Sequence, residues 1–310
     1  MPLDLKKTFE SLKDELEGTI EFGAPLSKIS YFRIGGPATV LVTPKTMKDL
    51  VLISNAIIET GAQYFMLGWG SNLLFSDQGF PGVVIRMKNL FTEIEELPGN
   101  MLRVGASVGA SSLLRRAQEN GYGNFSRLTG IPGSVGGMVA MNAGTHLGEM
   151  KDLITKIESV KIADKIAKNF DLHSHIPGEQ SFSYRKNNFL SPGELVTHIE
   201  LRYTPQDPAL VKLEIDELYQ RRKKTQPVDF PSCGSVFMNP PGKSAWQVID
   251  EAGLRGHRIG NAQFAEKHSN FIINLGEAKA VDVEALIALA KKRVKDQLGI
   301  ELQEEVRIVK

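Results

Sequence analysis

Apolar side chains recur along this chain at two spacings, and each spacing predicts a different element of secondary structure. Apolar positions three or four residues apart are typical of helices, whereas alternating positions and short apolar runs are typical of strands. Helices are expected over residues 4–17, 46–60, 111–119, 210–224, 244–252 and 281–298. Strands are expected over residues 38–43, 64–67, 73–75, 83–87, 101–104, 154–162, 195–203, 271–274 and 302–308. The pattern therefore mixes helices and strands along the length of the chain.

Local signals mark both ends of one predicted helix. Thr46 and Asp49 form a capping-box pattern at its start, and Gly61 follows its expected end. The strands expected on either side of this helix complete a β-α-β unit. The second strand of that unit is followed by a glycine-containing loop that begins at Gly68.

The last predicted strand places one acidic residue apart from its apolar neighbours. Leu302 and Val306 share one face of the strand, and Glu305 has the opposite parity. Successive side chains of a strand point to opposite faces. We therefore expect Glu305 to point away from the apolar layer, toward solvent or a cleft.

Residues 130–144 hold five glycines and a proline but no charged residue. A solvated glycine linker would be rich in serine and charge, so this stretch is expected to pack closely against another part of the protein. Its main-chain N–H groups, with Ser134 and Asn142, suit a phosphate-bearing ligand. Tight packing of a glycine loop on a sheet is the alternative, and this stretch alone does not decide between the two.

A second glycine loop, Gly68-Trp69-Gly70-Ser71-Asn72, follows the strand predicted at 64–67. Two such loops in one chain suggest a dinucleotide ligand. The loop is not a Rossmann fingerprint, because Leu73 stands where that motif has its third glycine and no amphipathic helix begins there. A Walker loop is also excluded, since Gly242-Lys243-Ser244 lacks the required first glycine, whose place is taken by Phe237. We therefore expect a different nucleotide-binding fold.

Length and composition exclude several functional classes. At 310 residues the chain exceeds a single core of roughly 100–200 residues, so two or three lobes are expected, with a boundary at residues 204–208. The net charge of +1 shows no excess of basic residues of the kind that binds nucleic acid. No apolar run approaches the roughly 20 residues of a membrane helix. The histidines are scattered, so no metal site is expected. A single cysteine, Cys233, excludes an internal disulfide and favours the cytoplasm.

Several motifs follow one another in an order that resembles one enzyme family. In the first half they are Phe32-Arg33-Ile34-Gly35-Gly36, Gly68-Trp69-Gly70-Ser71-Asn72, Gly130-Ile131-Pro132-Gly133 and Asn142-Ala143-Gly144. In the second half they are Tyr184-Arg185, Ser232-Cys233-Gly234-Ser235, Gly253-Leu254-Arg255-Gly256, His268-Ser269-Asn270-Phe271 and Glu304-Glu305-Val306-Arg307. Together they resemble the UDP-N-acetylenolpyruvoylglucosamine reductases, also called UDP-N-acetylmuramate dehydrogenases. The length between Arg185 and Gln226 is similar to the shorter subtype, which lacks an inserted lid over the substrate.

The resemblance implies an α+β flavoenzyme with an FAD-binding domain of the vanillyl-alcohol oxidase type and a smaller α+β substrate-binding domain. The FAD-binding region is expected over residues 1–204, in two lobes of about 1–66 and 67–204. The substrate-binding domain is expected over 205–310, with its last strand returning to the active site. The family binds FAD without a covalent bond. The residues that the resemblance assigns to FAD are Gly68, Gly70, Ser71, Asn72, Leu73, Gly130, Pro132, Gly133, Ser134, Gly137, Asn142, Ala143 and Gly144.

The reaction implied by the resemblance is the NADPH-dependent reduction of UDP-N-acetylglucosamine enolpyruvate to UDP-N-acetylmuramate, for peptidoglycan synthesis in the bacterial cytoplasm. Hydride from reduced FAD would reach the terminal methylene carbon, and Ser235 would donate a proton to the carbon beside the carboxylate. Arg185 and Glu305 would hold and polarise that carboxylate, a task that suits the planar guanidinium group of Arg185. Tyr184 and Asn239 are the further residues expected to bind substrate. No nucleic-acid, membrane or obligate protein partner is expected.

Each of these residues also has a simpler interpretation. Taken alone, Ser235 would be a serine that bonds its own turn, and Tyr184 a half-buried packing ring. Arg185 and Glu305 would be members of surface ion pairs. Two rival functions stay open as well: a flavin oxidase of the same superfamily, and a nucleotide-sugar-binding protein without catalytic activity.

Two positions depart from the family pattern. Thr225 stands where some members have a lysine that meets the nucleotide pyrophosphate, so Lys223 or Lys224 would have to serve instead. Ala265 stands where many members have a serine. These departures affect the expected contacts with UDP and leave the catalytic assignments unchanged.

Overall fold

The structure is a computed structural model that describes residues 3–310, and in it the chain forms two compact units. The larger unit comprises the residues up to Phe22 together with Thr39–Trp69 and Gly82–Gln220. The smaller unit comprises Gly23–Ala38, Gly70–Pro81 and Arg221–Lys310. Each unit is therefore assembled from segments that lie far apart in the sequence, and each has hydrophobic core clusters of its own.

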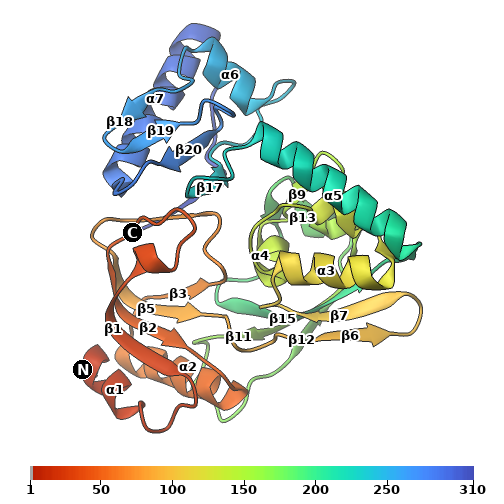
Figure 1. The fold of residues 1–310 in the computed structure, drawn as a ribbon. Helices are drawn as coiled ribbons and strands as arrows, with labels where there is room; N and C mark the ends of the chain where they lie inside the picture. Colours follow the sequence, from red (N-terminus) through yellow and green to blue (C-terminus); the bar gives the residue numbers. More distant parts are fainter. Residues whose placement is uncertain (1–2) are drawn as a thin grey trace. The chain divides into compact units, whose positions relative to one another are not determined.

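One sheet of the larger unit has the strand order β1–β2–β5–β3 (Figure 1). Its strands are β1 (Thr19–Pro25), β2 (Pro37–Thr43), β5 (Phe80–Arg86) and β3 (Tyr64–Leu67). Helices α1 (Leu5–Ser11) and α2 (Met47–Thr60) pack on this sheet, and Phe9 and Leu50 bury their side chains in its core. Thr46 and Asp49 cap α2, and Gly61 ends it in the left-handed region. The predicted β-α-β unit and its capping box are thereby confirmed.

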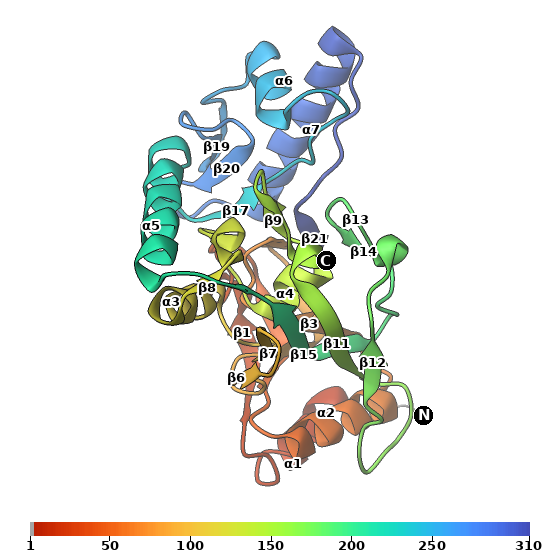
Figure 2. The same ribbon diagram turned by 90° about the vertical axis from the view of Figure 1, so that its right-hand side faces the viewer.

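A second sheet of the larger unit is antiparallel and has the order β12–β11–β15–β7–β6 (Figure 2). Its strands are β12 (His173–His175), β11 (Ile154–Lys161), β15 (Glu194–Arg202), β7 (Met101–Gly105) and β6 (Ile94–Leu97). Helices α3 (Ala110–Asn120), α4 (Val135–Ala140) and the first part of α5 (Pro208–Thr225) bury Leu113, Val139 and Val211 in one core with this sheet. The expected pairing of the strands at 154–162 and 195–203 is confirmed.

Short strand pairs and 3₁₀ turns complete the larger unit. The pairs are β8 (Tyr122–Gly123) with β16 (Thr204–Pro205), β9 (Gly144–Thr145) with β10 (Gly148–Glu149), and β13 (Phe182–Ser183) with β14 (Lys186–Asn187). The 3₁₀ turns are Phe125–Leu128, Met150–Asp152 and Glu179–Ser181. The pair β13–β14 forms a hairpin whose two turn residues are Tyr184 and Arg185.

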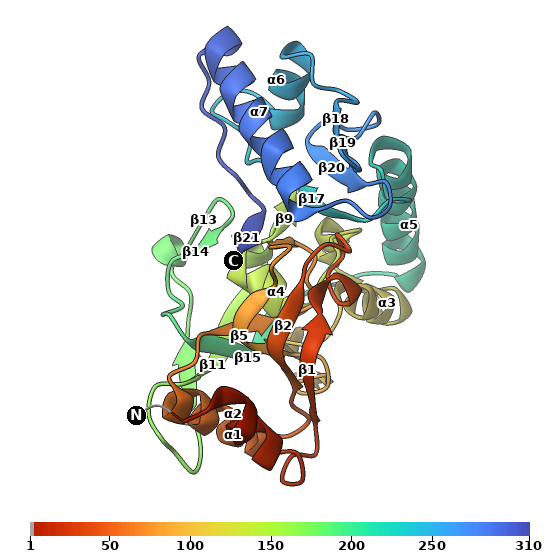
Figure 3. The same ribbon diagram turned by 90° about the vertical axis from the view of Figure 1, so that its left-hand side faces the viewer.

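The smaller unit contains a four-stranded sheet of the order β17–β20–β19–β18 (Figure 3). Its strands are β17 (Ser232–Ser235), β20 (Phe271–Asn274), β19 (Ala262–Phe264) and β18 (Arg258–Ile259). Helices α6 (Ala245–Glu251) and α7 (Ala280–Leu298) pack on it, and a 3₁₀ turn spans Leu26–Lys28. A parallel pair, β4 (Leu73–Phe75) with β21 (Arg307–Val309), joins the segment after the first glycine loop to the end of the chain.

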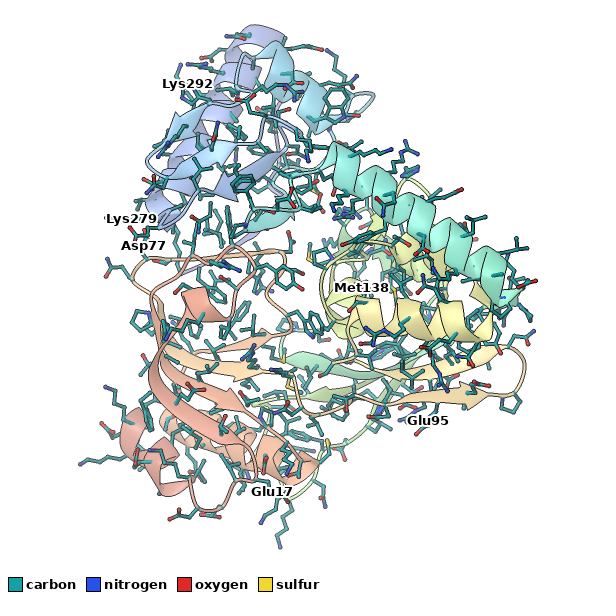
Figure 4. All side chains as sticks on the ribbon, in the orientation of Figure 1. Glu17, Asp77, Glu95, Met138, Lys279 and Lys292 are labelled. Atoms are coloured by element: carbon teal, nitrogen blue, oxygen red, sulfur yellow. The ribbon has the colours of Figure 1, made fainter. Side chains whose placement is uncertain are left out.

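Asp77 fastens the start of α7 within the smaller unit (Figure 4). Its carboxylate accepts hydrogen bonds from the N–H groups of Ala280 at 2.8 Å and Val281 at 3.1 Å. The first N–H groups of a helix have no partner inside the helix, so a carboxylate at this position stabilises it. The segment that follows the first glycine loop is thus tied to the longest helix of the chain.

The prediction of a helix over residues 4–17 is wrong in its second half, because α1 ends at Ser11. The buried carboxylate of Asp49 accepts hydrogen bonds from the N–H groups of Glu17 at 3.1 Å and Gly18 at 2.9 Å. A helix would use the N–H of Glu17 within its own ladder. These long-range bonds to Asp49 therefore replace the last turn that the apolar spacing predicts.

The predicted strand at 302–308 is also shorter than expected. Only Arg307–Val309 form a strand, and Glu304 makes an isolated bridge with Phe237. Leu302 and Val306 are buried as the alternation predicts. The strand is interrupted because the chain changes its pairing partner between Glu304 and Arg307, from Phe237 to β4.

Candidate active site

The glycine stretch at residues 130–144 folds around α4, a helix that the sequence pattern does not predict. Ser134 caps this helix, since its Oγ accepts a hydrogen bond from the N–H of Gly137 at 3.3 Å. Gly136 lies against Ala106, and an added Cβ at Gly136 would come within 2.7 Å of the Cβ of Ala106. Close packing therefore requires the glycine at this position, as the simpler interpretation of the stretch expected.

The first glycine loop meets the start of α4. An added Cβ at Gly68 would lie 2.8 Å from the Oγ of Ser134. The indole ring of Trp69 covers Gly109, where an added Cβ would lie 2.5 Å from ring atoms. Within the larger unit, the two predicted ligand loops thus come together at Ser134.

Three buried hydroxyl groups beside this stretch make no hydrogen bond to any of residues 3–310: those of Ser107, Thr129 and Thr197. Thr129 directly precedes Gly130, and the main-chain oxygen of Thr197 accepts from the N–H of Ala106, next to Ser107. A buried hydroxyl without a partner costs about 1–3 kcal/mol. These groups fit the polar atoms of a dinucleotide such as FAD. None of the three is identified from the sequence, although Thr129 adjoins Gly130 and Ser107 lies two residues from both Gly105 and Gly109.

Asn142 lies beyond the end of α4 and is fully buried. Its Nδ2 donates to the Oε2 of Glu149 at 2.9 Å and to the main-chain oxygen of Ser183 at 3.0 Å. Its Oδ1 accepts from the N–H of Lys151 at 3.1 Å. Both amide hydrogens therefore have partners within the protein. A contact between Asn142 and FAD stays a prediction.

Tyr184 and Arg185 form the two-residue turn of the hairpin β13–β14, because Ser183 pairs with Lys186. Arg185 has a φ of 58°, in the left-handed region that is uncommon for residues other than glycine. The guanidinium carbon of Arg185 lies 5.2 Å from the centre of the Tyr184 ring. Cation and ring are thus held together at the tip of the hairpin.

In the smaller unit, Ser235 and Glu305 come from segments that are hydrogen bonded to each other. The N–H of Glu305 donates to the main-chain oxygen of Val236 at 2.8 Å. Strand β17 is irregular between Ser232 and Ser235, and Gly234 has a φ of 80°. Such a bulge turns a side chain out of the regular alternation. The half-buried Ser235 lies at this bulge.

The loop residues Gly70–Leu73 also meet the segment that carries Glu305. The Nδ2 of Asn72 donates to the main-chain oxygen of Glu305 at 2.9 Å, and the N–H of Arg307 donates to the main-chain oxygen of Asn72 at 3.1 Å. The parallel pairing of β4 with β21 continues this contact. The smaller unit therefore joins one predicted cofactor loop to two of the three predicted catalytic residues.

Cys233 is a packing residue of this region. Burial, followed by the nearby carboxylate of Glu305, raises the pKa of the Cys233 thiol to about 12. The thiol is therefore protonated at neutral pH and has little nucleophilic character. This agrees with the structural role that the sequence analysis favoured for the only cysteine.

Asn239 has a local partner in the smaller unit. Its Oδ1 accepts a hydrogen bond from the N–H of Ala245 at 2.9 Å, at the start of α6. The residue itself is exposed. The amide nitrogen of Asn239 takes no part in this hydrogen bond. A contact between Asn239 and substrate stays a prediction.

The structure sorts the predicted site residues into two groups. The larger unit holds Gly68, Gly130, Pro132, Gly133, Ser134, Gly137, Asn142, Ala143, Gly144, Tyr184 and Arg185. The smaller unit holds Gly70, Ser71, Asn72, Leu73, Ser235, Asn239 and Glu305. Residues 3–310 contain no group of three or more histidine, cysteine or acidic side chains that could hold a metal ion. No helix among them is long and apolar enough to cross a membrane.

Two family profiles match this chain. Residues 38–166 match a profile described as an FAD binding domain. Residues 226–309 match a profile described as the C-terminal domain of UDP-N-acetylenolpyruvoylglucosamine reductase. The predicted order, an FAD-binding domain followed by a smaller α+β domain, is thereby confirmed.

Full-length relatives agree with these matches. UDP-N-acetylenolpyruvoylglucosamine reductase of Geobacter metallireducens is 38% identical, with 97% of each chain covered. That of Anaeromyxobacter dehalogenans is 41% identical over 92% of this chain and 84% of its own. The crystal structure of UDP-N-acetylenolpyruvylglucosamine reductase from Thermus caldophilus superposes with a TM-score of 0.80 at 36% identity, covering 94% of this chain and all of that one. At this identity over this length, the chain belongs to the UDP-N-acetylenolpyruvoylglucosamine reductase family and is an FAD-dependent oxidoreductase.

Proposed function

We propose that this enzyme uses NADPH to reduce the enolpyruvyl group of UDP-N-acetylglucosamine enolpyruvate, giving UDP-N-acetylmuramate for peptidoglycan synthesis. The observation that carries the proposal lies in the smaller unit. There the N–H of Glu305 bonds the residue after Ser235, and Asn72 of the glycine loop bonds Glu305. A proton donor, a carboxyl group and a cofactor loop are thus built into one hydrogen-bonded unit. The substrate class is supported by the relatives, which are UDP-N-acetylenolpyruvoylglucosamine reductases.

The residues near the two loops fit FAD. Gly68 lets the Ser134 hydroxyl lie directly against its main chain, and the hydroxyls of Ser107 and Thr129 are available to polar atoms of a ligand. In the smaller unit, Gly70–Leu73 would contribute main-chain N–H groups. When bound and reduced by NADPH, FAD supplies the hydride that the enolpyruvyl group takes up.

Ser235 donates the proton in this proposal. A serine hydroxyl is a weak acid in water and gives up its proton only to a strongly basic centre. Hydride addition to the terminal methylene carbon leaves negative charge on the carbon beside the carboxylate, and that carbon is such a centre. The bulge at Ser232–Ser235 directs the hydroxyl out of the sheet alternation.

Arg185 binds and polarises the substrate carboxylate. Its guanidinium group stays charged and matches a carboxylate with two parallel hydrogen bonds. Positive charge placed there stabilises the negative charge that spreads into the carboxylate during hydride addition. Glu305 shares this task in its protonated form, because a charged carboxylate would repel that of the substrate.

The test is the visible absorption spectrum of the purified protein under nitrogen, first with NADPH and then with the enolpyruvyl sugar nucleotide. We expect a flavin band that bleaches with NADPH and returns with the nucleotide sugar. A band that bleaches and does not return would reject the substrate. That outcome would favour a flavin oxidase, whose band returns with oxygen. A protein that binds the nucleotide sugar but holds no flavin would favour a binding protein without activity.

A further inference from the structure

Two asparagine side chains fasten the turn that carries Arg185 to the end of α4. Before the turn, the Nδ2 of Asn142 donates to the main-chain oxygen of Ser183 at 3.0 Å. After the turn, the Nδ2 of Asn187 donates to the main-chain oxygen of Ala140 at 2.6 Å. All of these residues belong to the larger unit. The turn is therefore held on both sides by the same helix end.

Each asparagine is itself locked in place. Ala140 is the last residue of α4, where main-chain oxygens have no partner within the helix. Asn187 supplies a donor to this oxygen, while its Oδ1 accepts from the N–H of Leu190 at 3.1 Å. Asn142 is buried and bonds Glu149 and the N–H of Lys151 as well. Neither amide group can rotate without losing a second hydrogen bond.

The hairpin by itself is a weak support for the turn. Strands β13 and β14 contain two residues each, and an isolated two-stranded hairpin is at best marginally stable in water. Arg185 also has a φ of 58°, a conformation that costs roughly 1–3 kcal/mol for a residue other than glycine. Such strain persists only where the surrounding structure holds it. The two asparagines supply that hold.

We propose that Asn187, together with Asn142, is a positioning residue for binding of the substrate carboxylate. The two side chains hold the Tyr184–Arg185 turn so that the guanidinium group meets the carboxylate in one orientation. This inference rests on the proposed function, in which Arg185 binds the enolpyruvyl carboxylate.

Helix α4 gives this hold a further consequence. It starts at Ser134 in the glycine stretch, and six residues of helix extend about 9 Å. The whole helix thus lies within the predicted cofactor stretch 130–144, and the arginine turn is hydrogen bonded to its end. The hydrogen bonds of Asn142 and Asn187 therefore fix the position of the arginine turn relative to the predicted cofactor stretch.

The experiment compares two neighbouring asparagines. Asn187→Asp keeps the acceptor for the N–H of Leu190 but replaces the donor to Ala140 with a carboxylate oxygen. Asn188→Asp is the control. It adds the same charge one residue away, and Asn188 is exposed, with its Nδ2 donating to the oxygen of Gln180 and not to α4. Asn142→Asp is less suitable, because it would bury a carboxylate beside Glu149.

Two readouts decide the inference. We expect Asn187→Asp to lower kcat/KM for the enolpyruvyl sugar nucleotide about tenfold or more, and Asn188→Asp to change it less than twofold. Amide hydrogen exchange of residues 183–187, followed by mass spectrometry in the holoenzyme, should be several-fold faster in Asn187→Asp alone. In an Arg185→Ala background, Asn187→Asp should lower kcat/KM no further, because it acts through Arg185.

The opposite results would overturn the inference. An Asn187→Asp enzyme that matches Asn188→Asp in both readouts shows that the bond to α4 positions nothing. An equal further loss in the Arg185→Ala background shows that Asn187 acts by another route. If the wild-type flavin band does not return with the enolpyruvyl sugar nucleotide, the proposed function fails. The exchange measurement still decides whether Asn187 holds the turn.

Discussion

The two regions that carry the predicted catalytic residues are held by different kinds of hydrogen bond. Around Ser235 and Glu305, main-chain groups from distant segments bind one another directly, and the side chains of Asn72 and Asn270 add to these bonds. Around the Tyr184–Arg185 turn, two short strands are fastened by the side chains of Asn142 and Asn187. Main-chain hydrogen bonds survive most substitutions, whereas a side-chain amide is lost with a single one. The turn should therefore be the more easily loosened of the two regions.

The two regions also differ in what a substitution should change. Around Ser235 and Glu305, replacing a catalytic side chain should remove a reaction step while the fold stays intact. Around the Tyr184–Arg185 turn, replacing a supporting residue should change how well substrate is held. Three predictions test this difference, beginning with the largest effect.

Ser235→Ala should slow the return of the flavin band with the enolpyruvyl sugar nucleotide by about 10³-fold, because the proton donor is lost. The rate of flavin reduction by NADPH should stay within a few-fold of the wild-type rate, because Ser235 has no role in that step. Stopped-flow absorbance measures both rates in one protein. A Ser235→Ala enzyme with wild-type turnover would show that Ser235 is not the proton donor, whatever the substrate.

Asn270→Ala should destabilise the segment around Ser235 and Glu305, because it removes a buried side-chain amide that bonds Phe237. The buried Asn270 accepts from the N–H of Phe237 at 3.0 Å and donates to the oxygen of Phe237 at 2.8 Å. Alanine leaves both groups of Phe237 without these partners, so we expect a loss of about 2–4 kcal/mol in the free energy of unfolding. Urea denaturation measures this loss.

Asn261→Ala is the matched control for this substitution. Its side chain takes part in an exposed hydrogen bond with Arg258, so a change below about 0.5 kcal/mol is expected. If Asn270→Ala and Asn261→Ala unfold at the same urea concentration, the main-chain bonds hold the region without Asn270.

Asp49→Asn should destabilise the larger unit without loosening the turn. Burial acts to raise the pKa of Asp49, but hydrogen bonds from the N–H groups of Lys45, Glu17 and Thr46 and from the Thr46 hydroxyl outweigh it and hold the pKa below its ordinary 3.8. Because the folded pKa is lower than the unfolded one, the carboxylate stabilises the fold above about pH 4. This stabilisation is lost as the pH falls through the folded pKa.

Urea unfolding of the wild type and Asp49→Asn at several pH values measures this contribution. The wild type should be more stable by about 1 kcal/mol at pH 7, and the difference should shrink as the pH falls below about 4. The kcat/KM at pH 7 should stay within twofold of wild type. A tenfold loss of kcat/KM would show that general destabilisation of the larger unit is enough to disturb the turn. The effect of Asn187→Asp would then not be specific.

Much of the fold could be predicted from local patterns. The capping box of Thr46 and Asp49 and the left-handed Gly61 define α2, because caps and stops are set by neighbouring residues. The helix α4 could not be predicted in this way. Its two glycines have low helix propensity, and Gly136 has to be a glycine because Ala106, thirty positions earlier, leaves no room for a side chain.

Some residues of the candidate site could likewise be predicted from the sequence, and others could not. The motifs around Arg185, Ser235 and Glu305 were identified from the sequence, and the family that they indicate is confirmed. The buried hydroxyls of Ser107 and Thr129 were missed, because burial depends on what packs on them. Ordinary serines and threonines carry no signal of that kind.

By itself, the amino-acid sequence determined the family, the order of the domains and the elements whose ends are set by local residues. Tertiary structure alone decided that Asn142 and Asn187 fasten the arginine turn, and that Glu305 pairs beside Ser235. These contacts join residues as far apart as Val236 and Glu305. Local propensity acts over a few residues, whereas a hydrogen bond between distant segments forms only when the packing of the cores brings its two groups together.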